Sequence, residues 1–450
     1  MDVSVFYDRD KFLRETELPF RLYLIYLVSF FIHIPARFSV LGLIRFDLVL
    51  VGVICFLIFS NKSTKGGRLD DASKYLLAIF IYSVAVLPLV EWPGSVVNNG
   101  LYEFVKGAIF YFFTVNLVFS ERRLKLLLFV FISCNIFRVF EPLYLNITTG
   151  YLGSSTYLGG SDYAGRLAGA PSDTINANGL AFVIASIFPF LHYVFAPLNK
   201  KTWMLYAIIV PVLLYTMGLT LSRSGVLALG IIAFGIFIKS KRKVALLCLG
   251  VVGIFAIWSS LNDIQKDRYL SLVSEDSRQA STAQGRVEGW FTDFEVAMNR
   301  PIIGHGLGTS REANWNVAGN DRVSHILWAE IVQEIGVIGL VLFILYLKTM
   351  IMNFIEAGRL IKSRLPESHF LSRCTQAMQV WLLMNLLFSF ASYGLKSYEW
   401  YLFGGLSVVL MNIIKGKVSE VSIENNGATK NDNSLAGKRF SLARRINRQG

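Results

Sequence analysis

Long, uninterrupted apolar segments limit what this chain can fold into more than any other feature of the sequence. A helix needs roughly 20 apolar residues to cross about 30 Å of hydrocarbon, and the chain offers many segments of this kind. They are continuously apolar, whereas the strands of a membrane barrel alternate in polarity. The sequence therefore predicts an all-α polytopic membrane protein with about twelve transmembrane helices and one long loop outside the membrane. The expected spans cover residues 20–36, 39–60, 74–91, 101–119, 124–145, 176–197, 203–221, 224–239, 243–261, 325–355, 374–393 and 398–415.

Basic residues give these spans an expected orientation. Lysine and arginine collect in the connections that follow every second span, for example at Lys62, Arg122, Lys200 and Lys241. Because basic loops stay on the cytoplasmic side, both termini are expected in the cytoplasm. The net charge of +13 is explained by these loops and does not indicate nucleic acid. The polar segment 1–17 does not have the pattern of a cleaved signal peptide, so none is expected.

The predicted organisation has four parts. Residues 1–261 form nine membrane helices with short loops, and residues 262–324 form the long outside loop. Residues 325–415 form the last three helices, and 416–450 is a basic cytoplasmic tail that is not expected to fold. The four cysteines lie in or beside apolar spans without the spacing of a metal site, so we expect small buried apolar side chains.

Arginine dominates the basic residues of the long loop. The loop holds one lysine, Lys266, and six arginines: Arg268, Arg278, Arg286, Arg300, Arg311 and Arg322. Arginine suits phosphate and carboxylate because its planar fork donates two parallel hydrogen bonds. An amphipathic helix is expected over Ser281–Asn299, resting on the bilayer or on the bundle. Its apolar residues Val287, Trp290, Phe291, Phe294 and Val296 lie mostly on one face. The glycine-rich turn that follows contains His305, and its glycines indicate positive φ or a close backbone approach.

Two further outside segments carry an arginine each. Arg166 lies in a Gly- and Ser-rich loop near 146–175, and Asn178 opens the next helix. Arg223 lies in a tight turn between two apolar spans, where an arginine is costly unless it has an anionic partner or reaches water. Each arginine could be a plain interfacial side chain. Together, arginines on three outside segments predict a site for one multiply charged anion, since charge-assisted hydrogen bonds contribute roughly 1.5–3 kcal/mol each.

His325 is the candidate general base. It follows Ser324, a good helix N-cap, at the outer end of an apolar span. The pKa of an unperturbed imidazole lies near 6.5, which suits proton transfer at neutral pH. The alternative is a polar residue that marks the membrane interface.

Two acidic residues, Glu330 and Glu334, lie one turn apart within the same span. Carboxylates at such positions are usually functional or paired. They could orient a neighbouring residue, or they could pair with Arg45, Lys106 or Arg138. The chain has no phosphate-binding loop of the nucleotide type and no Cys/His metal cluster, so neither a cofactor nor a metal is expected.

Several short motifs surround the long loop. In chain order they are the Leu-Ser-Arg-Ser-Gly turn with Arg223, the loop helix with Arg286, the glycine-rich turn at 300–308, His325, and the segment Glu-Ile-Gly-Val-Ile-Gly-Leu at 334–340. The residues 166–169 and Asn178 precede them in the previous outside loop. This order and spacing resemble the O-antigen polymerase and O-antigen ligase superfamily, over roughly residues 160–345. One departure is Ile326, because the family often has Asn or Ser after this histidine.

The resemblance implies a GT-C-type membrane glycosyltransferase with about twelve helices. Its donor would be a glycan on undecaprenyl pyrophosphate at the outer face of the bacterial inner membrane. The glycan would pass to a sugar hydroxyl with inversion and without a metal. The two family arginines that hold the pyrophosphate fall on Arg223 and Arg286, and the family histidine falls on His325. The remaining candidate substrate-binding residues are Arg166, Asn178, Arg322 and Glu334.

Three functions remain open at this point. The first is a polymerase of lipid-linked oligosaccharide repeats, with membrane lipids, a glycan acceptor and a chain-length regulator as candidate partners. The second is the ligase that moves finished polymer onto lipid A–core. The third is a solute transporter, but inverted-repeat carriers tend to have matching broken spans in their two halves, and the sequence has no internal repeat of this kind.

Overall fold

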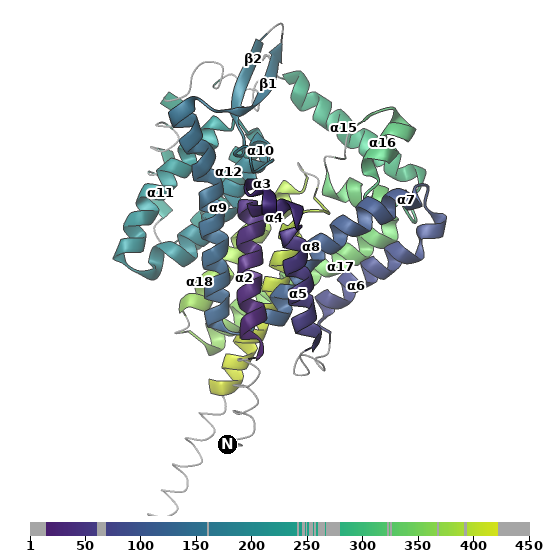
Figure 1. Cartoon of the computed structure of the whole chain (residues 1–450). Coiled ribbons are helices and arrows are strands. Elements are labelled where there is room, and N and C mark those ends of the chain that lie inside the picture. Colours follow the sequence, from purple (N-terminus) through teal and green to yellow (C-terminus); the bar gives the residue numbers. More distant parts are fainter. Residues whose placement is uncertain are drawn as a thin grey trace, which may run out of the picture.

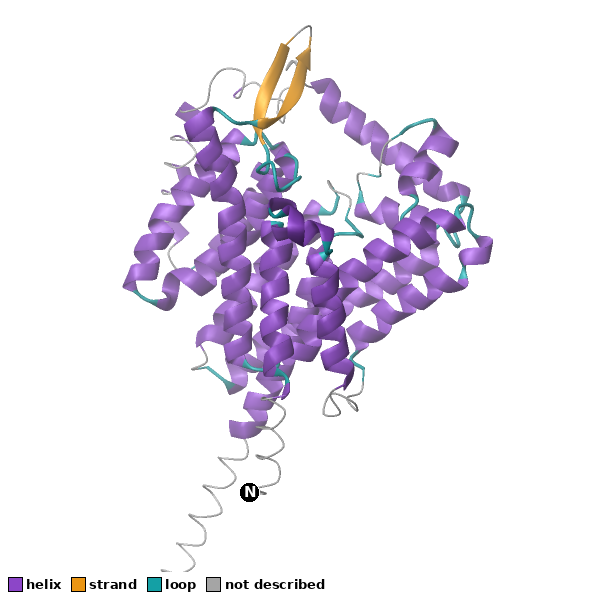
Figure 2. Cartoon of the chain, viewed as in Figure 1, coloured by secondary structure: helices purple, strands orange, loops and turns teal. Residues whose placement is uncertain are grey.

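The computed structural model is a bundle of α-helices with one β-hairpin among the described residues (Figure 1, Figure 2). It describes residues 15–60, 69–159, 162–240, 280–321, 326–366, 369–390 and 394–421, together with Ser324 and a few positions between 243 and 266. Among them, five helices are long and apolar enough to cross a membrane, and their bounds are Glu121–Thr149, Ala177–Leu198, Lys200–Leu219, Leu327–Arg364 and Tyr398–Val421. The predicted class of polytopic membrane protein is therefore supported, while the number of spans stays a prediction.

The helices follow the chain in the order that the apolar segments predict. The first group comprises α2 (Glu17–Ile32), α3 (Ile34–Arg37), α4 (Ser39–Leu43), α5 (Phe46–Ser60), α6 (Asp71–Ala85), α7 (Pro93–Ser95), α8 (Leu101–Leu117) and α9 (Glu121–Thr149). The second group comprises α10 (Ala177–Phe190), α11 (Lys200–Leu219), α12 (Arg223–Lys239), α15 (Ala280–Asn299), α16 (Ser310–Ala318), α17 (Leu327–Arg364), α18 (His369–Phe388) and the unlabelled last helix (Tyr398–Val421). The predicted span 243–261 lies largely outside the described residues.

Polar caps set where these helices begin. The side chain of Asp70 accepts a hydrogen bond from the backbone N–H of Ser73 at the start of α6, and Ser120 does the same for Arg123 at the start of α9. Asn176 caps α10 and Ser222 caps α12 in the same way. Each cap satisfies one of the N–H groups that a helix start leaves without a partner.

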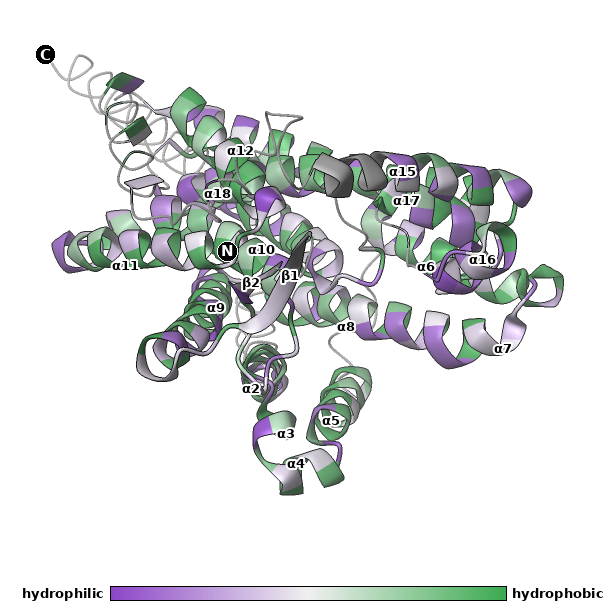
Figure 3. Cartoon of the chain, turned by 90° about the horizontal axis from the view of Figure 1, so that it is seen from above, coloured by the Kyte–Doolittle hydropathy of each residue, from purple (hydrophilic) through white to green (hydrophobic). Residues whose placement is uncertain are grey.

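The described part of the chain forms two groups of helices. Seen from above, α6, α15, α16 and α17 lie together on the side away from α9 and α11, and hydrophilic residues gather around α16 (Figure 3). On one side α10 contacts α9, α12 and α18, and on the other α17 contacts α6 and α15. Aromatic side chains fill the core between helices, for instance Trp381 stacked on Phe403.

A β-hairpin stands where the sequence predicts a plain loop, so the expectation of an all-α chain is wrong at this point. The strands β1 (Gly153–Gly159) and β2 (Asp162–Leu167) pair antiparallel, with Ser154 opposite Arg166. The Gly- and Ser-rich composition of the segment favoured a turn, but Thr156, Tyr157 and Tyr163 suit a short strand ladder. The hairpin matters because it carries Arg166.

Helix α17 is broken at Gly336, and the glycine-rich turn before it packs into the break. Gly336 has φ 65° and ψ −173°, and a Cβ atom there would overlap the carbonyl oxygen of Ile302. The backbone N–H groups of His305 and Gly306 donate to the carbonyl oxygens of Gln333 (2.7 Å) and Glu334 (2.9 Å). Gly304, Gly306 and Gly308 all have positive φ, as the glycine pattern predicts.

Candidate functional site

Arg166 and the turn before α12 are joined by one asparagine. Nη2 of Arg166 donates to Oδ1 of Asn178 (2.6 Å), and Oγ of Ser222 donates to the same oxygen (3.0 Å). Nε of Arg166 donates to the carbonyl oxygen of Thr220 (2.9 Å). The hairpin, the start of α10 and the turn 220–222 therefore meet at Asn178, as two of the predicted outside segments should.

Arg223 is the first residue of α12 and lies next to this meeting point. Ser222 caps the helix. The residue before it, Leu221, has a φ of 49°. The side chain of Arg223 is only 7% exposed, and that of Arg166 is 9% exposed. The start of a helix favours anions because its free N–H groups and dipole are positive. Arg166 and Arg223 are therefore two buried arginines beside the capped start of one helix.

A buried ion pair holds the loop that follows the hairpin. Nε of Arg138 donates to Oδ2 of Asp173 (2.7 Å), and Nη2 donates to Oδ1 (3.2 Å). The hydroxyl of Tyr151 donates to the carbonyl oxygen of Gly169 at the base of the hairpin (2.7 Å). These contacts fix the position from which Arg166 reaches Asn178.

Contacts at one end of the bundle connect this cluster to the start of α17. The ring of Phe182, one turn after Asn178, stacks on Phe388 at the end of α18, with ring centroids 4.9 Å apart. The next residue, Ser389, accepts a hydrogen bond at its carbonyl oxygen from the backbone N–H of Leu327 (3.1 Å). The starts of α10 and α17 are therefore neighbours of the same helix end.

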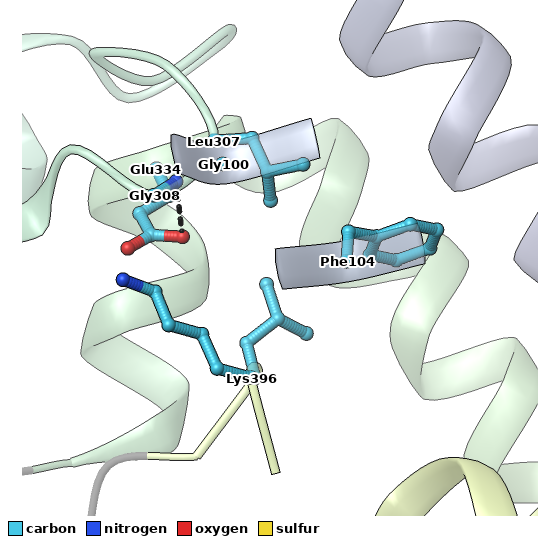
Figure 4. Close-up of a pocket in the computed structure, with 7 residues that line it drawn as sticks. Gly100, Phe104, Leu307, Gly308, Glu334 and Lys396 are labelled. Atoms are coloured by element: carbon cyan, nitrogen blue, oxygen red, sulfur yellow. Dashed lines mark hydrogen bonds between the residues drawn. The ribbon is translucent and has the colours of Figure 1, made fainter. Parts of the chain in front are cut away.

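Glu334 faces the glycine-rich turn. Its carboxylate accepts hydrogen bonds from the backbone N–H groups of Gly308 (2.8 Å) and Ser310 (3.4 Å). Figure 4 shows the ammonium group of Lys396 pointing toward this carboxylate across a small cavity, which Gly100, Phe104 and Leu307 also line.

Glu330, one turn earlier in α17, takes the same kind of partner. It accepts hydrogen bonds from the backbone N–H groups of Gly394 and Leu395, both at 3.0 Å. The sequence suggested Arg45, Lys106 or Arg138 as partners of the two carboxylates. Instead Arg138 pairs with Asp173, and Lys106 lies 3.5 Å from Glu103.

His305 has a packing environment of its own. It is fully buried and stacks on Trp92, with Nδ1 3.0 Å from the Glu91 carboxylate and Nε2 3.2 Å from the carbonyl oxygen of Val296. These contacts tie the glycine-rich turn to the segment after α6 and to α15. His305 therefore has a structural role in this position.

The predicted loop helix is confirmed as α15, and only part of its expected apolar face packs against the described part of the protein. Asp293, Val296 and Ala297 are buried against the rest of the protein, while Phe291 and Phe294 are exposed. The sequence placed Phe291 and Phe294 on the same face as Val296. Asp293 was missed because a carboxylate does not normally belong to a buried stripe, although its spacing from Val296 and Ala297 is the helical one.

Three predicted site residues lie wholly or partly outside the described residues. His325 and Arg322 lie outside the described residues, and so does the side chain of Arg286, whose backbone lies in α15. The described residues bring together Arg166, Asn178 and Arg223, and they place Glu334 beside the glycine-rich turn. No group of three His, Cys, Asp or Glu side chains suited to a metal occurs in the part of the chain that the structure describes.

Comparison with known proteins bears on the region from α11 to the break in α17. No curated protein matches the chain. Residues 207–344 match the family model Wzy_C, described as O-antigen ligase, and this stretch contains Arg223, α15, the glycine-rich turn and Glu334. The match confirms the predicted resemblance: over these residues the chain is similar to a family of membrane glycosyltransferases that takes in both O-antigen ligases and O-antigen polymerases.

Proposed function

We propose that this protein polymerises oligosaccharide repeat units that are carried on undecaprenyl pyrophosphate, at the outer face of the bacterial inner membrane. The observation that carries the proposal is the cluster at the start of α12, where Asn178 joins Arg166 to the turn that presents Arg223. It lies at the edge of the region that matches the O-antigen ligase model, and it suits a diphosphate. Both termini would lie in the cytoplasm.

The chemistry follows from the leaving group. The hydroxyl oxygen of the acceptor sugar attacks the anomeric carbon of the donor, and the bond from that carbon to the bridging phosphate oxygen breaks. Negative charge grows on that oxygen, and undecaprenyl pyrophosphate leaves. Arg223 and Arg286 would stabilise this charge, a role that a divalent cation takes in other enzymes. His325 would accept the proton of the attacking hydroxyl. Because the hydroxyl displaces the pyrophosphate in a single step, the anomeric centre is inverted.

The other candidate residues would support this reaction by holding the donor and the loop. Arg166 and Asn178 would fix the geometry of the diphosphate site, because their hydrogen bonds set the turn before α12. Arg322, three residues before His325 in the sequence, would add a further cation to the site. Glu334 would act through the glycine-rich turn, since its carboxylate holds the backbone of Gly308 and Ser310.

A second candidate function is the ligase that transfers finished polymer to lipid A–core. The description of the matching family model as O-antigen ligase favours it. The two functions share the donor, the leaving group and the arginines, and they differ in the acceptor. A chain-length regulator would be a partner of the polymerase.

Glycan profiling of a deletion strain tests these proposals. A polymerase deletion should leave a single repeat unit on the lipid core, and plasmid-borne protein should restore the ladder. Accumulation of unattached polymer would assign the ligase function instead. An unchanged glycan profile together with altered solute uptake would refute both and favour a transporter.

A further inference from the structure

A buried polar network joins α15, α16 and the start of α17. Nδ2 of Asn314 donates to Oδ1 of Asp293 (3.1 Å), and Oγ of Ser324 donates to Oδ2 (2.9 Å). Nε2 of Gln333 donates to Oδ1 of Asn314 (2.9 Å) and to the carbonyl oxygen of Asp293 (2.8 Å). All four side chains are at most 5% exposed.

Ser324 is the member of the network that directly precedes His325 in the sequence. Its hydroxyl also contacts Ile326, the residue after His325: Oγ of Ser324 lies 3.2 Å from the carbonyl oxygen of Ile326 and 3.4 Å from its nitrogen. The next N–H, of Leu327, donates to the carbonyl oxygen of Ser389. The described neighbours of His325 on both sides are therefore tethered.

The distance along the chain is short enough to pass a displacement on. Consecutive Cα atoms are 3.8 Å apart across a trans peptide. A shift of Ser324 away from Asp293 would therefore disturb the contacts of Ser324 with Ile326 at the start of α17. Reactions that depend on one well-placed proton acceptor lose on the order of 10²-fold in rate for a misplacement of about 1 Å.

Packing alone does not account for these side chains. Burying a carboxylate costs free energy unless hydrogen bonds replace its water, and apolar residues of similar volume often hold helices together at least as well. Gln333 adds a further cost, because its Oε1 is buried without a hydrogen-bond partner among the described residues. A network that costs stability and ends at Ser324 is better explained by the geometry it imposes there.

We infer that Asp293 is a positioning residue for the proposed reaction, because it holds Ser324 and thereby the backbone that leads into α17, the stretch of the sequence in which His325 falls. The inference rests on the proposed function and deepens it. Asn314 and Gln333 orient the Asp293 carboxylate from the far side. Asp293 itself has no place among the predicted catalytic residues.

The test uses the full-length protein in nanodiscs with a lipid-pyrophosphate-linked glycan donor, and it measures release of undecaprenyl pyrophosphate. The variants are Asp293→Asn, Ser324→Ala, the double variant, and Ser324→Thr as the conservative rescue. Asp321→Asn is the matched control, because Asp321 is an exposed carboxylate whose partner, Arg311, also lies outside the network. Thermal unfolding is followed for each variant.

We expect kcat to fall roughly 10- to 100-fold in Asp293→Asn and in Ser324→Ala, with KM for the donor unchanged because the arginines still hold the diphosphate. The kcat of the double variant should be no lower than that of the less active single variant. Ser324→Thr and Asp321→Asn should retain activity.

Two results would overturn the inference. One is full kcat in Ser324→Ala, which also decides the matter if Asp293→Asn fails to fold. The other is a loss of total activity that matches the loss of folded protein in every network variant, which would mean a purely structural role. His325→Ala distinguishes failure of the proposed function from failure of the positioning role. Full activity in His325→Ala would refute the proposed function itself. An inactive His325→Ala together with a fully active Ser324→Ala would refute the positioning role alone.

Discussion

Replacing Gly336 with alanine should open the junction between the glycine-rich turn and α17. An L-residue held at φ 65° and ψ −173° costs about 1–3 kcal/mol, and a methyl group there would overlap the carbonyl oxygen of Ile302. Relieving the overlap requires the turn to move away. That movement would break the bonds from His305, Gly306 and Val337 to Gln333, Glu334 and Pro301, each worth about 1 kcal/mol. The total loss should be about 4–6 kcal/mol.

Two measurements follow this loss, namely the thermal unfolding temperature of the purified protein in detergent and glycan ladder formation in a deletion strain. Gly230→Ala is the matched control, because Gly230 is a helical glycine in α12 with open space around its Cβ position. We expect Gly336→Ala to unfold several degrees lower and to lose the ladder, while Gly230→Ala behaves like the wild type. Wild-type unfolding and a full ladder in Gly336→Ala would refute the account of the docked turn.

Three further predictions test other parts of the structure. Asn178→Leu removes the oxygen shared by Arg166 and Ser222, so it should lower donor turnover at least 10-fold with little change in the amount of membrane-inserted protein, and turnover equal to wild type would contradict this role. Asp173→Asn leaves the Arg138 guanidinium buried with a neutral partner and should cost about 3–5 kcal/mol, seen as a lower unfolding temperature, whereas the exposed Asp321→Asn should leave that temperature unchanged. A phosphatase fusion after residue 290 should be active and one after 416 inactive, and the opposite pattern would reverse the proposed orientation.

The apolar pattern of the sequence predicted the positions of the helices well. It predicted the structure of the segments between them less well. Segments such as 124–145 and 203–221 correspond to α9 and α11, because a continuous apolar run with a polar cap has few alternatives. The glycines at 304, 306 and 308 correctly indicated positive φ. The break at Gly336 was not predicted, since a glycine within an apolar helix pattern is usually tolerated there, and only the docked turn forces the chain out of the helix.

The candidate site was predicted in part for a similar reason. Arg166, Asn178 and Arg223 stand out as polar residues beside apolar spans. In the structure, hydrogen bonds join Arg166 and Asn178 to the turn 220–222, which directly precedes Arg223. Asp293 and Gln333 lie within helical segments that look ordinary in sequence. Asp293 and Gln333 contact each other across 40 residues of sequence, and no local pattern of polarity predicts such a contact.

Substitution of the three predicted catalytic residues tests the central claim most directly. Arg223→Ala, Arg286→Ala and His325→Ala would each be expressed in a deletion strain, with the glycan ladder and the amount of protein in the membrane measured side by side. Arg223→Lys should also fail or fall far below wild type, because lysine keeps the charge but lacks the planar fork. We predict that each alanine variant inserts into the membrane and makes no ladder. Normal ladders from all three would contradict a diphosphate site built from outside arginines with a histidine base.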